Sequence, residues 1–69
     1  MFKENEFRAQ VMRAGKTYRE LAEYLGINES TLYRKVKADG SFTREEINKI
    51  ITFLGIENPK EIFFAEELA

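Results

Sequence analysis

The side chains best suited to recognition chemistry lie along residues 28–36, where the spacing of apolar residues predicts a short helix. Leu32 and Val36 fall on its inward face. The outward positions of this stretch, with the residue after it, are Glu29, Ser30, Tyr33, Arg34 and Lys37. Arg34 can donate two parallel hydrogen bonds to one planar acceptor, and a hydroxyl can both donate and accept. This face therefore suits hydrogen bonding and charge pairing with a polar partner.

The composition argues against several other kinds of chemistry. The chain has no cysteine and no histidine, which removes disulfides, thiolate nucleophiles and the usual zinc ligands. We see no pair of carboxylates placed to converge on a pocket, so we expect no enzyme. We also expect no metal and no cofactor, and no small-molecule effector is evident in the sequence. No apolar run approaches the roughly 20 residues of a membrane span, and the first residues lack the apolar core of a signal peptide. We expect one cytoplasmic domain over residues 1–69.

The net charge of −1 is unevenly distributed along the chain. Five basic and three acidic residues give residues 16–37 a charge of +2, whereas three basic and seven acidic residues give residues 38–69 a charge of −4. Domains that bind nucleic acid are usually basic, so the overall sum argues weakly against such a partner. The predicted recognition face nevertheless belongs to the positive part of the chain.

A second short helix is expected immediately before this one. Thr17 begins it with a capping box, in which the Thr17 hydroxyl accepts from the backbone N–H of Glu20 while the Glu20 side chain reaches back to Thr17. Gly26 ends that helix in the left-handed conformation, and Asn28 caps the next one. Residues 17–37 are therefore predicted to form helix, short turn, helix.

Three further helices complete the predicted fold. The first lies between Lys3 and Ala14, where apolar residues recur one turn apart. A polar turn at 38–41 precedes the fourth helix, which Thr43 begins with a second capping box, and a fifth starts at Pro59. We see no strand, repeat or linker. Five short helices with short connections predict an all-α domain whose helices cross at open angles.

The predicted core follows from the apolar faces of these helices. Its members are Phe7, Val11, Leu21, Ala22, Leu25, Ile27, Leu32, Val36, Ile47, Ile50, Ile51, Leu54 and Ile62. Ala22 is expected to be small because the two central helices approach one another at that position.

A family resemblance rests on residues in and around the predicted turn. These residues are Leu21, Ala22, Leu25, Gly26, Ile27, Ser30, Leu32 and Val36. With this spacing the chain resembles the helix-turn-helix of the lambda repressor and Cro superfamily, and more narrowly it is similar to small phage and prophage proteins. The resemblance covers nearly the whole chain. It implies a compact five-helix, lambda-repressor-like DNA-binding domain whose second motif helix lies in the major groove.

Two departures from the family pattern bear on this resemblance. Family members often pair an arginine in the first helix with a glutamate at the end of the recognition helix, and the matching positions here are Val11 and Val36. We interpret this as a changed core contact that keeps the fold. The family often has glutamine at the positions of Tyr18 and Glu29, so those amide contacts to DNA cannot be transferred unchanged.

The resemblance implies double-stranded DNA as the partner and assigns candidate contacts. The candidate DNA-binding residues are Lys16, Thr17, Tyr18, Arg19, Asn28, Glu29, Ser30, Thr31, Tyr33, Arg34, Lys37, Ser41 and Arg44. Arg34 is the first choice for a base contact, because it suits O6 and N7 of guanine, and the alternative is a solvated charge. Tyr33 could contact a thymine methyl or a sugar, or pack across its own helix. Thr17 and Tyr18 lie at a helix N-terminus, which favours a phosphate, and Thr17 also serves as a cap.

The remaining candidates have more general roles. The residues expected to bind phosphates beside the groove are Lys35, Lys37, Ser41 and Arg44. Glu29 could accept from cytosine, but the helix dipole alone explains an acid in the first turn.

A domain of this size reads few bases, so we expect a homodimer on half-sites about 34 Å apart. Phe63 and Phe64 point about 100° apart on a helix, so either one is an exposed dimer contact or both cover the base of the core. The expected function is that of a sequence-specific DNA-binding transcriptional regulator. Most simply it is a Cro-like repressor in a bacterial or phage-infected cell. The alternative is a protein-protein interaction module on the same fold that uses the acidic C-terminal third.

Overall fold

The computed structural model describes residues 2–63, and these residues form five α-helices and no strand. The helices are α1 (Glu4–Arg13), α2 (Tyr18–Leu25), α3 (Glu29–Lys37), α4 (Arg44–Leu54) and α5 (Pro59–Phe63). The all-α fold class and the order of the helices agree with the sequence prediction. No helix within residues 2–63 is long and apolar enough to cross a membrane.

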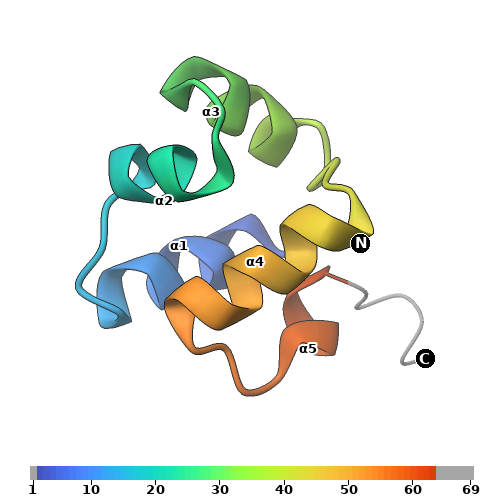
Figure 1. The fold of residues 1–69 in the computed structure, drawn as a ribbon. Coiled ribbons are helices and arrows are strands. Elements are labelled where there is room, and N and C mark those ends of the chain that lie inside the picture. Colours follow the sequence, from blue (N-terminus) through green and yellow to red (C-terminus); the bar gives the residue numbers. More distant parts are fainter. Residues whose placement is uncertain (1, 64–69) are drawn as a thin grey trace.

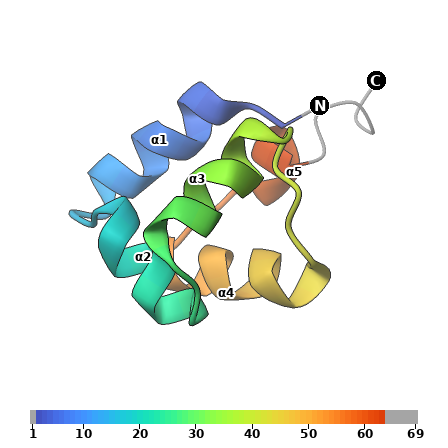
Figure 2. The same ribbon diagram turned by 90° about the horizontal axis from the view of Figure 1, so that it is seen from above.

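The two central helices form one end of the molecule. Figure 1 shows α2 and α3 at the top, α1 and α4 across the middle, and α5 at the opposite end. Helix α2 packs against both α3 and α4, while α1 packs against α5. In the view from above, α3 is the helix nearest the reader (Figure 2). The fold therefore displays α3 at an outer edge.

Both predicted capping boxes are present. At the start of α2, Thr17 Oγ1 accepts from the backbone N–H of Glu20 at 3.1 Å, and Glu20 Oε1 accepts from the Thr17 N–H at 3.0 Å. Thr43 and Glu46 repeat this arrangement at α4, with distances of 3.1 and 2.9 Å. Asn28 holds the N-cap position of α3, but its side chain forms no capping hydrogen bond, so that prediction was only partly right. The start of α3 has less local stabilisation than the other two helix starts.

Buried apolar side chains from all five helices form one core. Its members are Phe2, Phe7, Val11, Leu21, Ala22, Leu25, Leu32, Val36, Ile50, Leu54, Ile56, Ile62 and Phe63. Three predicted members, Ile27, Ile47 and Ile51, are only partly buried and pack at its edge. The apolar stripe of α4 is wider than the surface that the described neighbouring segments cover. Two isoleucines of α4 therefore stay at the rim.

Aromatic rings close the core where the chain enters α1. The ring of Phe2 lies 5.4 Å from that of Phe7 and 5.7 Å from that of Phe63, measured between centroids. Phe42 completes this cluster at 6.2 Å from Phe63. Phe63 is 8% exposed, so this side chain packs in the core, which fits both alternatives predicted for the pair. Phe64 lies outside the described residues.

Gly40 lies where the turn after α3 passes over Phe2. Gly40 and Gly15 share a φ of 69°, in the left-handed region that favours glycine. A Cβ on Gly40 would collide with the Phe2 ring and lie 2.8 Å from the Phe2 Cβ, whereas a Cβ on Gly15 would meet nothing within 4 Å. Alanine at the two positions therefore separates backbone strain from a steric clash.

We expect Gly15→Ala to lower the free energy of unfolding by about 1–2 kcal/mol, the cost of a left-handed conformation for a residue with a Cβ. Gly40→Ala is expected to lower it by about 1–3 kcal/mol more, because the aromatic ring must move inside a packed cluster. Denaturant titration of both variants measures the difference. Equal losses would show that the Phe2 ring yields without cost.

Candidate nucleic-acid interface

One face of α3 is buried and the opposite face is open to solvent. Leu32 and Val36 are 0% and 2% exposed, as their spacing predicted. The exposed residues at the start of the helix and along its open face are Asn28, Glu29, Ser30, Tyr33, Arg34 and Lys37. Thr31 is partly buried. The structure thus places the candidate residues of this helix on one accessible surface.

Arg34 borders a shallow hollow between α3 and the turn that follows it. The hollow has a volume of about 240 Å³, and its lining residues are Thr31, Arg34, Lys35, Ala38 and Ser41. Arg34 Nη2 donates a hydrogen bond to Thr31 Oγ1 at 3.3 Å. The fold therefore brings Ser41, which the sequence placed in the following turn, beside Thr31 and Arg34 of α3.

The starts of α2 and α4 supply backbone N–H groups suited to anions. In each capping box the glutamate side chain accepts a hydrogen bond from the backbone N–H of the threonine, and the threonine hydroxyl accepts one from the backbone N–H of the glutamate. The intervening N–H groups, those of Tyr18 and Arg19 in α2, lie outside the box and at the positive end of the helix dipole. Arg19 and Arg44 are exposed beside these two helix starts. Both termini can therefore receive a phosphate.

The side chain of Tyr18 lies between the core and α3. Its ring is 5.7 Å from the Phe7 ring and 4.8 Å from the Tyr33 ring. The Tyr18 hydroxyl is buried and has no hydrogen-bond partner among residues 2–63. Burial raises the pKa of this hydroxyl, and the nearby Arg8 guanidinium opposes the rise. Only the backbone N–H of Tyr18 remains for the expected phosphate contact, so that candidate role does not extend to its side chain.

The structure shows the packing role for Tyr33 and leaves the ring accessible, while its contact with DNA stays a prediction. Its ring packs on Tyr18, across the surface of the helix pair, and the side chain remains 46% exposed. An aromatic ring held in this way loses little rotamer freedom when it meets a sugar or a methyl group. Tyr18 therefore fixes the orientation of an exposed candidate contact.

We expect Tyr18→Phe to leave DNA affinity unchanged and to keep or slightly raise the free energy of unfolding. The substitution removes a buried hydroxyl that lacks a partner, a group that costs about 1–3 kcal/mol when unsatisfied. Tyr18→Ala is the matched variant, because it removes the ring under Tyr33 and should weaken both properties. Thermal melts and binding titrations distinguish the two variants. A loss of affinity in Tyr18→Phe would mean that the hydroxyl reaches DNA.

Several basic candidates are already paired with acidic side chains. Lys37 Nζ donates to Glu4 Oε2 at 2.8 Å, and Lys35 Nζ donates to Glu46 Oε1 at 3.1 Å. Arg19 lies 3.7 Å from Glu23. The Lys35 side chain is only 26% exposed, so its expected phosphate contact would first require that pair to open. Sequence reasoning missed the partners of Lys37 and Lys35, because no local pattern links residues 33 and 11 positions apart in the chain. Arg19 and Glu23 are one helical turn apart, so that pair is visible in the sequence.

The charge on Glu46 is favoured by its surroundings. Desolvation raises the pKa of Glu46, but hydrogen bonds from the Thr43 backbone and from Lys35 outweigh it, and the pKa lies below its ordinary value of 4.5. Glu46 therefore stays ionised at neutral pH while it serves both a helix cap and an ion pair.

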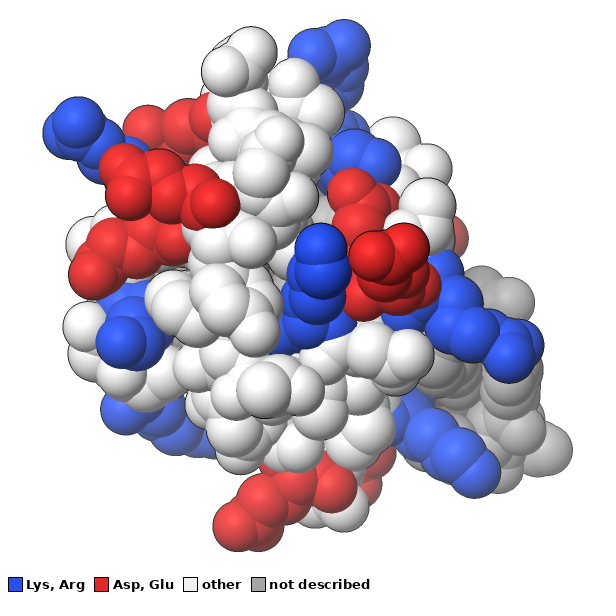
Figure 3. Space-filling view, viewed as in Figure 1, with Lys and Arg blue, Asp and Glu red and all other residues white. Residues whose placement is uncertain are grey.

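On the face shown in Figure 3, acidic and basic side chains alternate with uncharged ones and form no continuous basic surface.

Lys16 and Arg44 differ from the paired bases. Lys16 Nζ lies 5.1 Å from the centroid of the Phe53 ring, which itself stacks on Tyr24. Arg44 and Arg34 take part in no ion pair within the described part of the chain. Among the candidate residues, Arg34 and Arg44 can therefore meet a phosphate or a base without first breaking an ion pair.

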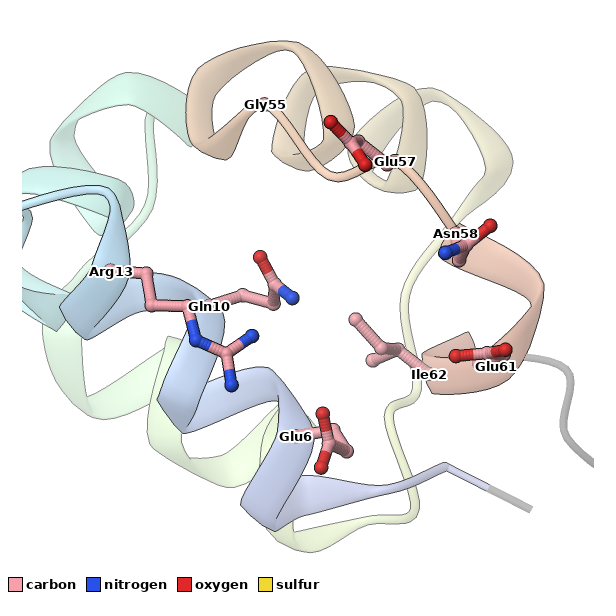
Figure 4. Close-up of a pocket in the computed structure, with 8 residues that line it drawn as sticks. All are labelled: Glu6, Gln10, Arg13, Gly55, Glu57, Asn58, Glu61 and Ile62. Carbon is pink, nitrogen blue, oxygen red and sulfur yellow. The ribbon is translucent and has the colours of Figure 1, made fainter.

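A separate polar pocket lies on another side of the molecule. Figure 4 shows its lining residues, which come from α1, the α4–α5 connection and α5: Glu6, Gln10, Arg13, Gly55, Glu57, Asn58, Glu61 and Ile62. Its volume is about 410 Å³. No residue of α2 or α3 lines it, so it is distinct from the surface described above. Residues 2–63 contain no group of side chains that could hold a metal ion.

The comparison with protein families agrees with this geometry. A family model described as a Cro/C1-type HTH DNA-binding domain matches residues 10–66. The chain belongs to this family. No curated protein and no solved structure gives a significant match. As a Cro/C1-type domain it is a DNA-binding protein, and the predicted lambda repressor and Cro resemblance is confirmed.

Proposed function

We propose that this Cro/C1-type domain is a sequence-specific transcriptional regulator that occupies an operator through the major groove. The observation that carries the proposal is the open face of α3, where Ser30, Tyr33 and Arg34 are exposed together. A helix that presents short hydroxyls, an aromatic ring and a guanidinium can read base edges by hydrogen bonds and by contact with thymine methyl groups.

The neighbouring helix starts support the same docking mode. The N-termini of α2 and α4 carry the two capped sets of backbone N–H groups, and phosphates bound there would fix the register of α3 in the groove. We propose Thr17, Arg19 and Arg44 as phosphate contacts, with Lys16 and Ser41 beside them. The proposed mode of action is that of a Cro-like phage or prophage repressor, which blocks transcription in a bacterial or phage-infected cell by occupancy.

A second copy of the chain is the proposed partner on DNA. The two isoleucines left at the rim of the core, Ile47 and Ile51, border an open groove of about 540 Å³ between α4 and α5, together with Phe42 and Pro59. Lys60 lines the groove, and Glu61 follows it in the chain. This stretch thus carries both signs of charge, so two copies related by a two-fold axis could pair Lys60 of one with Glu61 of the other.

Selection of bound duplexes from a random pool, at two salt concentrations, tests the function. We expect a consensus with two-fold symmetry and binding that weakens steeply as salt rises. A consensus without symmetry would support a monomer and overturn the dimer. Absence of enrichment at low salt would overturn the DNA-regulator proposal.

The rival function is a protein-binding module on the same fold. The acidic rim of the polar pocket, with Glu6, Glu57 and Glu61, favours it, because such a surface suits a basic peptide. Under that rival, every duplex would bind weakly and without salt dependence. The same selection experiment therefore separates the two functions.

A further inference from the structure

One carboxylate joins two basic side chains beside the recognition helix. Glu4 Oε2 accepts a hydrogen bond from Lys37 Nζ at 2.8 Å and lies 3.7 Å from Arg8 Nη2. Lys37 is the last residue of α3, whereas Glu4 and Arg8 lie one turn apart on α1. The cluster therefore ties the C-terminal end of α3 to the start of α1.

The two bases remain accessible while the acid lies deeper. The side chains of Lys37 and Arg8 are 64% and 57% exposed, and that of Glu4 is 30% exposed. An exposed ion pair contributes little to folding, so stability does not account for the cluster. Its larger consequence is electrostatic, because one negative charge offsets two positive charges on the flank of the proposed DNA-binding surface.

We infer that Glu4 restrains DNA affinity by competing with phosphate for Lys37 and Arg8. The inference rests on the proposed function. A phosphate that approaches Lys37 must either displace Glu4 or share the lysine with a second anion, and both weaken the attraction between lysine and phosphate. Glu4 is thereby an affinity-setting residue outside the helix-turn-helix, and it lowers the number of cations that release counterions on binding.

The Glu4 cluster acts on the part of DNA binding that does not depend on base sequence. Non-specific binding depends on the number of free cations, whereas specific binding also benefits from base contacts. The Glu4 carboxylate, beside the C-terminal end of α3, weakens the attraction between the basic side chains and phosphate. It leaves the base contact expected of Arg34 unchanged. Glu4 therefore lowers the affinity for the operator and for other duplexes alike, and the preference among base pairs stays with Arg34 and its neighbours on α3.

Glu4→Gln tests this inference against Glu6→Gln. Both substitutions remove one negative charge from α1, but Glu6 lies on the side of α1 that faces the polar pocket. We expect Glu4→Gln to raise affinity for non-specific duplex by about three- to tenfold at low salt and to steepen the salt slope by about 0.9 for each additional phosphate that the protein neutralises. Glu6→Gln should leave the slope unchanged, because screening weakens distant charges. In a Lys37→Gln background, the increase in affinity from Glu4→Gln should shrink.

The outcomes separate this inference from the proposed function. If the wild-type chain binds no duplex in a salt-dependent way, the proposed function itself fails. If the wild type binds but Glu4→Gln binds no tighter and keeps the same slope, the role of Glu4 alone is overturned. An equal increase in affinity from Glu6→Gln, or an undiminished increase in the Lys37→Gln background, would also overturn it. Circular dichroism melts confirm that each variant is folded at the assay temperature.

Discussion

Arg34→Ala is expected to weaken binding to the preferred duplex by about 1–3 kcal/mol and to relax the preference at a single base pair. The Arg34 guanidinium lies on the open face of α3 and donates to Thr31 Oγ1 at 3.3 Å. It forms no ion pair with any other residue of the 2–63 region. It can therefore exchange one neutral hydrogen bond for two bonds to a guanine without the cost of opening an ion pair.

Binding titrations on a panel of duplexes, each with one base pair changed, measure this effect. Arg44→Ala is the matched variant for a phosphate contact, and it should weaken all duplexes alike and reduce the salt slope by about one. Arg13→Ala, in the separate polar pocket, should change neither affinity nor slope. If Arg34→Ala weakens every duplex by the same factor, Arg34 contacts the backbone and base recognition falls to Ser30 and Tyr33.

The parts of the fold that sequence predicts best are those whose causes are local. Thr17 and Glu20 are three residues apart, so their capping box is visible in the sequence and is present in the structure. Gly26 has a φ of 75° and ends α2 as expected. The inward face of α3 follows from the spacing of Leu32 and Val36 alone. In each case one helical turn contains both the signal and its consequence.

The boundary of the core is harder to predict, because it depends on how much of each helix its neighbours cover. Ile47, Ile50 and Ile51 share one apolar stripe, so periodicity predicts that all three are buried. Only Ile50 is fully buried. Periodicity also carries no signal for Phe2 or Ile56, which precede and follow helices and are buried by contacts between distant segments.

The candidate site shows the same division between local and distant causes. Spacing alone placed Arg34 and Tyr33 on an exposed face. Tyr18 lies between Phe7 and Tyr33 because three helices meet there, so a helix start that looked free carries a partly buried side chain. The partner of Lys37 is 33 residues away in the chain, and its identity required the structure.

The second large effect concerns the apolar pair that replaces the family's arginine and glutamate. Val11 and Val36 are 3% and 2% exposed, and both belong to the core cluster. Val11→Arg would leave a buried charge without a partner, which costs about 3–5 kcal/mol. A domain of this size has a total stability of only about 3–10 kcal/mol. We therefore expect Val11→Arg to be largely unfolded at moderate temperature.

Met12→Arg is the matched control, because it adds the same charge at the next residue, where the side chain is 77% exposed. Its free energy of unfolding should stay within about 0.5 kcal/mol of the wild type. Adding Val36→Glu to Val11→Arg should recover part of the lost stability, since the two substitutions restore the family's pairing. Denaturant titration of Val11→Arg, Val36→Glu and the double variant measures the coupling. If the double variant is no more stable than Val11→Arg, the two valines do not occupy facing positions, and the family's pairing does not apply to this chain.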